Sequence, residues 1–266
     1  MTSQLDGPTQ AKQPEWRYQW ERFSDAEAFL FWDWVRPRTL ADFAGKRVLD
    51  AGCGPGHHIR LVAPAAAEVV GLDLNAHELA RANLADLPNV SIVEGDLARW
   101  KPDEPFDVIY SIGVIDHTDD PDASMAHLAS LLRPGGLLMA WVWSREGNRF
   151  MASVVEPVRA RVLRRRSRRA VERLARALTA VLYPVVHTVY RLPLRFLPYY
   201  AYFENFRRLT FERNALNVFD KLNAPYTELI SRERALSWFP ADDFEDVQIL
   251  PYRGVSWCAS ARRRSR

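Results

Sequence analysis

The sequence has few cysteines, no long apolar run and little net charge. Its two cysteines, Cys53 and Cys258, are too few for a disulfide framework, so we expect a reducing, cytoplasmic setting. The start of the chain lacks a charged-then-apolar signal, and we expect the polar residues 1–13 to form a disordered tail. The apolar piece at 177–190 is shorter than the ~20 residues that cross a membrane. A formal net charge of +3 does not by itself favour a nucleic-acid partner.

Glycine is also sparse, with 12 residues in the chain, but three of the glycines gather in one stretch. Val48 and Leu49 end a short apolar run that is typical of a buried parallel strand. Asp50 stands at the end of that run, and Gly52, Gly54 and Gly56 follow at alternate positions. Glycines at this density let the backbone turn sharply and let a ligand approach closely. The residues after the third glycine favour a helix whose free N–H groups face the same crevice, so we expect a ligand site here.

The spacing of these glycines narrows the choice of ligand. A dinucleotide-binding turn has its third glycine one residue later and holds a pyrophosphate on the helix N-terminus. The acid Asp50, just before the first glycine, repels phosphate but accepts from an ammonium group. The run Asp-Ala-Gly-Cys-Gly-Pro-Gly at 50–56 resembles the first motif of the class I S-adenosylmethionine-dependent methyltransferases. The resemblance implies S-adenosyl-L-methionine as cofactor, with the glycine loop against its methionine portion, and disfavours a nicotinamide dehydrogenase.

Two further acids extend the resemblance. Asp73 follows the second predicted strand, Glu68–Leu72, where a doubly wound sheet holds ribose hydroxyls. Asp96 follows the third predicted strand, Val90–Val93, and the family places there an acceptor for the adenine amino group; a surface-turn aspartate is the alternative. The cofactor-binding residues that the resemblance implies are Asp50, Gly52, Cys53, Gly54, Gly56, Asp73, Leu74, Asp96, Leu97, Ser111, Ile112 and Gly113.

The segment after the fourth predicted strand, Phe106–Ser111, resembles the fourth motif of small-molecule methyltransferases. Histidine is a common general base in enzymes, so His117 is our first choice for that role, with Asp116 behind it. The alternative is that His117 only supports the adenosine pocket, while Asp119 or Asp120 caps the next helix. These acids lack the spacing of a metal-ligand set, so we expect no metal.

The order of apolar runs and breakers predicts an α/β fold: a Rossmann-like, doubly wound, seven-stranded sheet with a closing antiparallel pair and an inserted helical lid. Helices are expected at 76–87 and 122–132, and a Pro-Gly-Gly turn at 133–136 leads into a fifth strand at 137–143. We predict six segments: a tail (1–13), a helical cap (14–44), the cofactor-binding core (45–149), the lid or substrate region (150–230), the last part of the sheet (231–260) and a basic tail (261–266).

An arginine-rich stretch, Arg159–Arg176, lies within the predicted lid and favours a basic amphipathic helix. The apolar piece after it is interrupted at Pro184. Three interpretations stay open: a lid over the substrate, a peripheral contact with anionic membrane or a lipid-linked substrate, or a dimer interface or solvated face. RNA binding is disfavoured because the arginines are not interleaved with stacking aromatics.

These patterns together predict a methyltransferase that moves a methyl group to an oxygen, nitrogen or carbon nucleophile of a small molecule, such as a natural product, a sugar or a lipid-linked acceptor. The alternatives are a non-catalytic protein of the same fold, and an enzyme that acts on a lipid or quinone at a membrane surface. Methylation of a nucleic-acid base is disfavoured because no Asn-Pro-Pro-Tyr-like tetrapeptide follows the fourth strand. A monomer and a homodimer both stay open.

Overall fold

The structure, a computed structural model, describes residues 28–163, 166–223 and 227–265. The predicted tail 1–13 and the first part of the predicted cap, up to residue 27, lie outside these ranges. So do residues 164–165 of the arginine-rich stretch and the last residue of the predicted basic tail.

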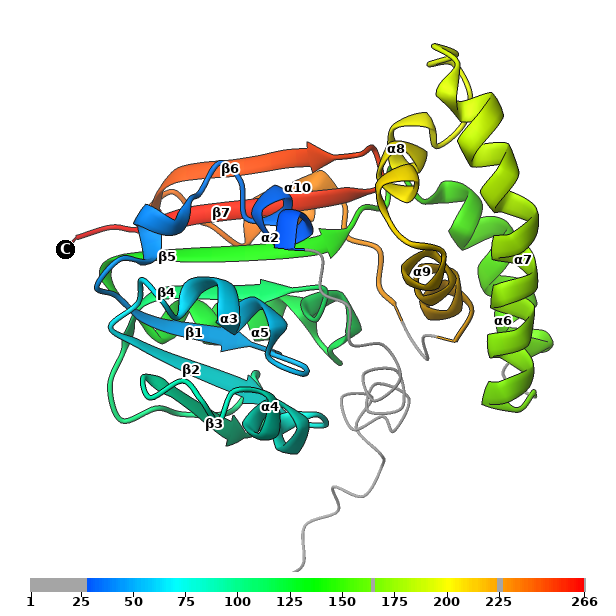
Figure 1. Cartoon of the computed structure of the whole chain (residues 1–266). Helices are drawn as coiled ribbons and strands as arrows, with labels where there is room; N and C mark the ends of the chain where they lie inside the picture. Colours follow the sequence, from blue (N-terminus) through cyan, green and yellow to red (C-terminus); the bar gives the residue numbers. More distant parts are fainter. Residues whose placement is uncertain (1–27, 164–165, 224–226, 266) are drawn as a thin grey trace, which may run out of the picture.

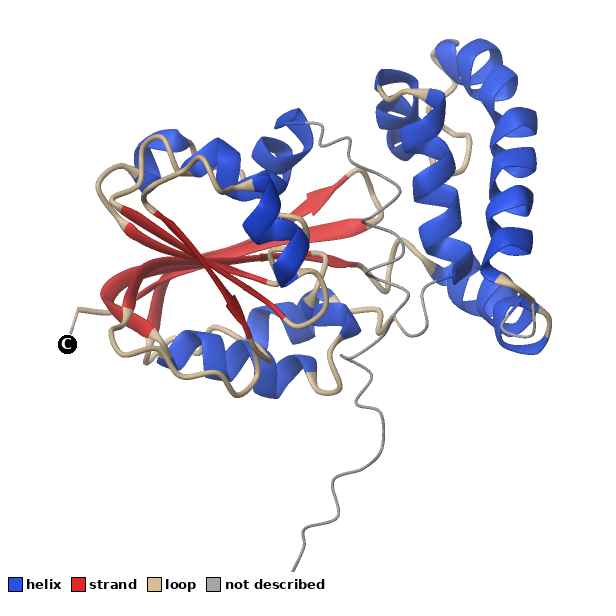
Figure 2. Ribbon diagram, turned by 60° about the horizontal axis from the view of Figure 1, so that its bottom comes forward, coloured by secondary structure: helices blue, strands red, loops and turns tan. Residues whose placement is uncertain are grey.

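The centre of the protein is one mixed sheet (Figures 1 and 2). Its strand order is β3-β2-β1-β4-β5-β7-β6. Strand β7 runs in the opposite direction to the other six strands. This confirms the predicted doubly wound sheet with its closing antiparallel pair. The strands are β1 (Arg47–Ala51), β2 (Glu68–Asp73), β3 (Val90–Glu94), β4 (Phe106–Ile112), β5 (Leu132–Trp143), β6 (Phe244–Tyr252) and β7 (Ser256–Arg263).

The parallel register brings the ends of the central strands to one edge. Ala51 pairs with Leu72, and Asp73 pairs with Glu94 on the next strand. On its other side β1 pairs with β4, so the strand order reverses between these two strands. Ligands of open α/β sheets bind beyond the carboxyl ends of the strands at such a reversal.

Helices cover both faces of the sheet (Figure 2). On one face, buried side chains of α2 (Ala28–Trp34), α3 (His57–Val62) and α4 (His77–Asn83) pack on β1, β2 and β4. On the other face, α5 (Pro121–Ser130) and α10 (Arg232–Ser237) contribute to a second apolar core. The strands alternate their side chains between these two cores, which explains why β1 and β4 are apolar along most of their length.

The start of β5 corrects one expectation. The Pro-Gly-Gly segment does not form a turn before the strand, because β5 already begins at Leu132 and pairs there with Phe106. Four residues of β5 (133–136) then oppose the single residue Asp107 of β4 before the pairing resumes at Val108 and Leu137. Gly135 adopts a φ of +77°, which a residue with a Cβ atom rarely adopts. The breaker residues therefore make an irregularity inside the strand.

The chain between β5 and α10 forms a group of helices beyond the carboxyl ends of the parallel strands (Figure 1). Its elements are a π-helical turn (Met151–Val155), α6 (Glu156–Arg161), α7 (Arg168–Thr188), a 3-10 turn (Val189–Arg191), α8 (Tyr200–Arg208) and α9 (Phe211–Asn223). The expected single basic helix at 159–176 is wrong: α6 ends at Arg161, and α7 joins the arginines from Arg168 onward to the apolar piece. Pro184 lies within α7 and does not end it.

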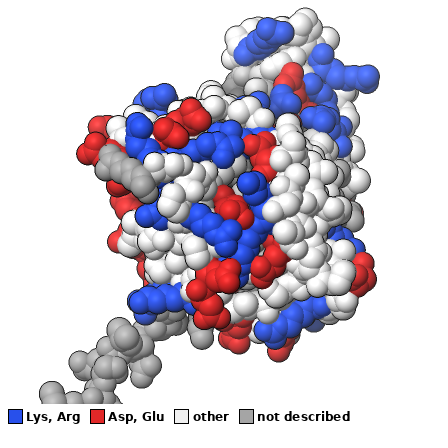
Figure 3. Space-filling model, turned by 90° about the vertical axis from the view of Figure 1, so that its left-hand side faces the viewer, with Lys and Arg blue, Asp and Glu red and all other residues white. Residues whose placement is uncertain are grey.

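Part of the predicted basic tail belongs to the sheet, because β7 continues to Arg263. Arg262 lies 3.4 Å from Asp42, and Arg264 lies 3.5 Å from Glu245. At the end of the molecule opposite α7, basic and acidic side chains are intermixed on the surface (Figure 3). Arg262 and Arg264 are therefore paired with carboxylates.

The N-terminus of α5 gives a test of the fold. The Asp120 carboxylate accepts from the backbone N–H groups of Asp122 and Ala123, both at 3.0 Å. We predict that Asp120→Ala lowers the free energy of unfolding by about 1 kcal/mol, because these donors lose their partner, while Asp120→Asn keeps most of the stability. Urea unfolding of the two variants checks this; equal losses in both would contradict the capping role.

Candidate active site

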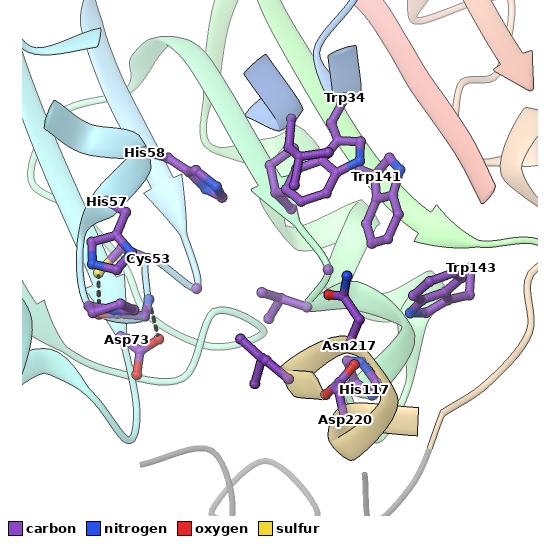
Figure 4. Close-up of a pocket in the computed structure, with 18 of the residues that line it drawn as sticks. Trp34, Cys53, His57, His58, Asp73, His117, Trp141, Trp143, Asn217 and Asp220 are labelled. Carbon is purple, nitrogen blue, oxygen red and sulfur yellow. Dashed lines mark hydrogen bonds between the residues drawn. The ribbon is translucent and has the colours of Figure 1, made fainter. Parts of the chain in front are cut away.

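A cavity of about 260 Å³ lies at the carboxyl ends of the strands (Figure 4). One side of it is made by the loops that follow β1, β2, β3 and β4. The other side is made by β5 and by helices α8 and α9. The cavity therefore joins the predicted cofactor site to the helices between β5 and β6.

The loop after β1 is held down on β2. The N–H groups of Gly52 and Cys53 both donate to the Leu72 carbonyl, at 2.7 and 3.1 Å. Gly52 has a φ of +90°, and a Cβ atom there would lie 2.5 Å from Cγ2 of Val114. Only glycine fits this position, because the backbone conformation and the close neighbour both exclude a side chain.

The Asp73 carboxylate is fixed at the end of β2 by three backbone donors. Oδ2 accepts from the N–H of Gly54 at 2.9 Å. Oδ1 accepts from the N–H groups of Asn75 at 2.8 Å and Ala76 at 2.6 Å. Each carboxylate oxygen keeps further acceptor capacity, so Asp73 can also accept from a ligand hydroxyl. Asp73 lines the cavity, in the orientation that Figure 4 shows.

The predicted adenine end of the site also lies on the cavity. Asp96 is half-buried, and its Oδ1 accepts from the N–H of Ala98 at 2.9 Å. Its neighbour Leu97 packs into the apolar core under the sheet. The predicted cofactor residues that line the cavity are Gly52, Cys53, Gly54, Asp73, Leu74, Asp96, Leu97, Ile112 and Gly113.

The predicted catalytic pair is split between the cavity and the wall behind it. His117 lines the cavity, and its Nδ1 lies 3.4 Å from Oγ1 of Thr227. Asp116 is fully buried behind it, and its Oδ2 accepts from the N–H of Trp143 at 3.2 Å. Burial raises the pKa of Asp116, against the opposing effect of the neighbouring histidine. A catalytic role for His117 stays a prediction, with Asp116 as its support.

Three tryptophans form an aromatic wall. The rings of Trp34 and Trp141 lie 4.8 Å apart, and those of Trp141 and Trp143 lie 5.0 Å apart. All three line the cavity. The indole Nε1 atoms of Trp34 and Trp141 have no hydrogen-bond partner among the described residues. Flat apolar surfaces suit a planar ligand that can stack on them.

Lys221, on α9, lies against the last ring of this wall and also lines the cavity. Its Nζ lies 3.6 Å from the centre of the Trp143 ring and 5.1 Å from that of Tyr202. Burial lowers the pKa of Lys221 to about 8, while the adjacent Asp220 carboxylate opposes that shift. The aromatic faces favour the ammonium form, so the side chain is poised between its two protonation states.

The methyltransferase domain family matches residues 22–194 of the chain, well over half of its length. The chain belongs to the class I S-adenosylmethionine-dependent methyltransferases. The match includes every residue that carried the resemblance in the sequence, from Asp50 to His117.

Curated relatives of this methyltransferase match over shorter segments. A trans-aconitate 2-methyltransferase of Klebsiella pneumoniae is 31% identical over 140 residues, which are 48% of this chain and 55% of that protein. A ubiquinone biosynthesis O-methyltransferase of a Bradyrhizobium species is 31% identical over 121 residues, which are 44% of this chain and 48% of that protein. The chain therefore spans about half the length of these relatives.

A solved structure resembles the methyltransferase over most of its length. Magnesium protoporphyrin IX methyltransferase from Synechocystis, crystallised with S-adenosylhomocysteine, covers 93% of this chain and 94% of its own. The TM-score is 0.53 and the sequence identity is 15%, a level that establishes a shared fold.

The residues of the methyltransferase fit its cofactor. Asp73 presents a carboxylate to the cavity, and Gly52 and Gly54 of the loop present backbone without side chains. The Cys53 thiol adds no charge, because burial raises its pKa well above the ordinary value. His58 also stays neutral, since burial lowers its pKa to about 3. Its ring stacks on Phe31 at a centroid distance of 5.0 Å. The loop therefore offers a largely uncharged surface beside one fixed carboxylate.

Four predicted residues do not line the cavity and support it from behind: Asp50, Gly56, Ser111 and Asp116. Burial raises the pKa of Asp50 to about 8, against the opposing effect of the Tyr110 hydroxyl. Ser111 donates from its Oγ to the Ala51 carbonyl at 2.7 Å. At Gly56 a Cβ atom would lie 2.4 Å from Cδ1 of Leu84. Asp116 was expected behind His117, and a contact of Asp50, Gly56 or Ser111 with the cofactor stays a prediction.

The sequence analysis missed the residues that complete the far side of the cavity. These are Trp34, His58, Trp141, Trp143, Tyr202, Asn217, Asp220 and Lys221. They come from five elements, and no local spacing links them. The one sequence signal for a site here was that Asp220 and Lys221 are adjacent, near the end of an amphipathic helix. Within the described part of the chain, no group of three or more His, Cys, Asp or Glu side chains has the arrangement of a metal site.

The environment of Lys221 gives a direct prediction. The chain has four lysines, so ¹³C-labelled lysine gives a simple NMR spectrum. We expect the Cε signal of Lys221 to titrate near pH 8, and we expect Asp220→Asn to lower that midpoint because it removes a carboxylate that favours the ammonium. Lys221→Arg assigns the signal by its disappearance. A Lys221 midpoint near the ordinary value of 10.5 would contradict the packing described here.

Proposed function

We propose that this methyltransferase transfers the methyl group of S-adenosyl-L-methionine to a hydroxyl oxygen of a small planar acceptor. The observation that carries the proposal is the continuity of the cavity. A single hollow runs from Asp73, on the predicted ribose side, to Trp143 and Lys221 on the side of α9. A cofactor at one end and an acceptor at the other would therefore meet without a wall between them.

The character of the far end supports a planar acceptor. Trp34, Trp141 and Trp143 present flat ring surfaces on which a planar acceptor can stack. The Bradyrhizobium relative, a ubiquinone biosynthesis O-methyltransferase, also methylates oxygen. Nitrogen and carbon nucleophiles are the alternatives that an acceptor screen separates.

The residues around the cavity can support the steps of methyl transfer. The bound cofactor supplies a sulfonium methyl that is displaced in line, so the protein mainly provides proximity, orientation and a dry site. The acceptor hydroxyl gives its proton to the imidazole of His117 as its oxygen becomes the nucleophile. The Lys221 ammonium, across the cavity, stabilises the negative charge that develops on that oxygen. Asp116, fixed by the Trp143 N–H, holds the segment that carries His117.

A non-catalytic protein of the same fold is the alternative function. It needs neither a general base nor a closed acceptor end. Two observations favour the enzyme: Asp116 is buried behind His117, and the rings of Trp143 and Tyr202 lie against Lys221. A protein that only binds a ligand needs neither arrangement.

We predict that His117→Ala lowers the single-turnover rate of methyl transfer by on the order of 10²–10³, because general-base catalysis contributes about that much. The assay uses ³H-methyl-labelled S-adenosyl-L-methionine and a panel of phenols, hydroxy acids and amines, with mass spectrometry to locate the new methyl group. A product methylated only on nitrogen or carbon would overturn the choice of oxygen.

His187→Ala is the matched control, since that histidine lies on α7 and does not line the cavity. Its rate should equal that of the unchanged protein. An unchanged rate in His117→Ala, with unchanged binding of S-adenosyl-L-homocysteine, would remove His117 from the mechanism.

A further inference from the structure

Helix α7 carries a line of exposed apolar side chains on one face. Leu174, Leu178, Val181 and Val185 recur every three or four residues, which places them along one side of the helix. Their exposed fractions are 38, 40, 68 and 40%. The line continues past the helix in three further exposed residues: Val189, Leu192 and Phe196, the last at 80%. We call these seven residues the α7 stripe.

The residues of the α7 stripe are not the ones that pack α7 on the rest of the protein. The residues of α7 that are buried, Val171, Ala175, Thr179 and Val186, occupy a different face. Val171 and Ala175 pack there against Leu216 and Phe219 of α9. Large contiguous apolar patches on a surface mark binding sites more often than chance exposure does.

Arginines flank the α7 stripe at both of its ends. Exposed Arg169 and Arg173 flank its start, and exposed Arg191 and Arg195 flank its end. Residues 173–203 contain no Asp or Glu. The one acid of α7, Glu172, lies 3.7 Å from Arg176. This differs from the opposite end of the molecule, where basic and acidic side chains are intermixed (Figure 3).

We propose that the α7 stripe binds the surface of an anionic lipid bilayer, with α7 lying in the plane of the interface. Apolar side chains enter the boundary between headgroups and acyl chains, and the flanking arginines contact lipid phosphates. None of the helices described is long and apolar enough to cross a membrane. The surface therefore fits a peripheral contact.

A second copy of the chain fits this surface less well. Two copies that met through their α7 stripes would bring arginines together, and residues 173–203 offer no carboxylate to pair with them. An anionic bilayer supplies the missing negative charge and accepts an apolar stripe of any length.

The proposed contact also lies close to the acceptor end of the cavity. Helix α9 packs on α7 through Phe219, and the adjacent residues Asp220 and Lys221 line the cavity. Of the elements described, only α7 and α9 therefore lie between the proposed bilayer contact and this end of the cavity.

Sedimentation with vesicles tests the proposal on the full chain. We expect binding to vesicles of equimolar phosphatidylcholine and phosphatidylglycerol that exceeds binding to phosphatidylcholine alone by at least about tenfold, and that weakens as salt is added. Two variants probe the surface: Leu178→Glu with Val181→Glu, which interrupts the apolar stripe, and Arg169→Glu with Arg173→Glu, which reverses its flanking charge. Each should lower binding to the anionic vesicles by at least about tenfold.

The matched control is Leu236→Glu, which places the same charge on an exposed leucine of α10, 43% exposed and outside the stripe. It should bind like the unchanged protein, and circular dichroism should show all variants folded. Failure of the unchanged protein to bind anionic vesicles would overturn the proposal. So would equal binding by Leu178→Glu/Val181→Glu. Light scattering that shows a dimer, dissociated by that pair and without vesicle binding, would assign the stripe to a second copy instead.

Discussion

The hydrogen bond from the Gly54 N–H to Asp73 is the interaction on which the site depends. It joins the loop after β1 to the end of β2, two points 19 residues apart in the chain. The same carboxylate fixes the start of the next loop through the N–H groups of Asn75 and Ala76. Because its neighbours are backbone donors, the loop can remain free of side chains where a ligand approaches.

This carboxylate also shapes the electrostatics around it. Its negative charge contributes to the raised pKa values of Asp50 and Cys53, after the larger effect of burial. One charge is thus concentrated at the end of β2, while the groups beneath the loop stay neutral. The far end of the cavity shows the opposite arrangement, with a cation on α9 held between aromatic rings.

Most of the sheet and the cofactor half of the site followed from the sequence. Apolar runs, glycine turns and acids at strand ends are local signals, and Asp73 and Asp96 lie at the cavity as expected. The far end of the cavity did not follow, because Trp34, Trp143 and Lys221 meet only through the tertiary fold. Two local interpretations failed for related reasons. Residues 133–136 resemble a turn but pair within β5, and Pro184 resembles a helix end but sits in a helix that packing on α9 stabilises.

Calorimetric titration with S-adenosyl-L-homocysteine tests the central claim most directly, because it needs no knowledge of the acceptor. The account predicts saturable binding at one site per chain, lost or weakened at least about tenfold in Asp73→Ala, with Asp86→Ala, an exposed aspartate paired with Arg60, as the unaffected control. Absence of binding to the folded, unchanged protein would contradict the account, as would equal affinity in Asp73→Ala.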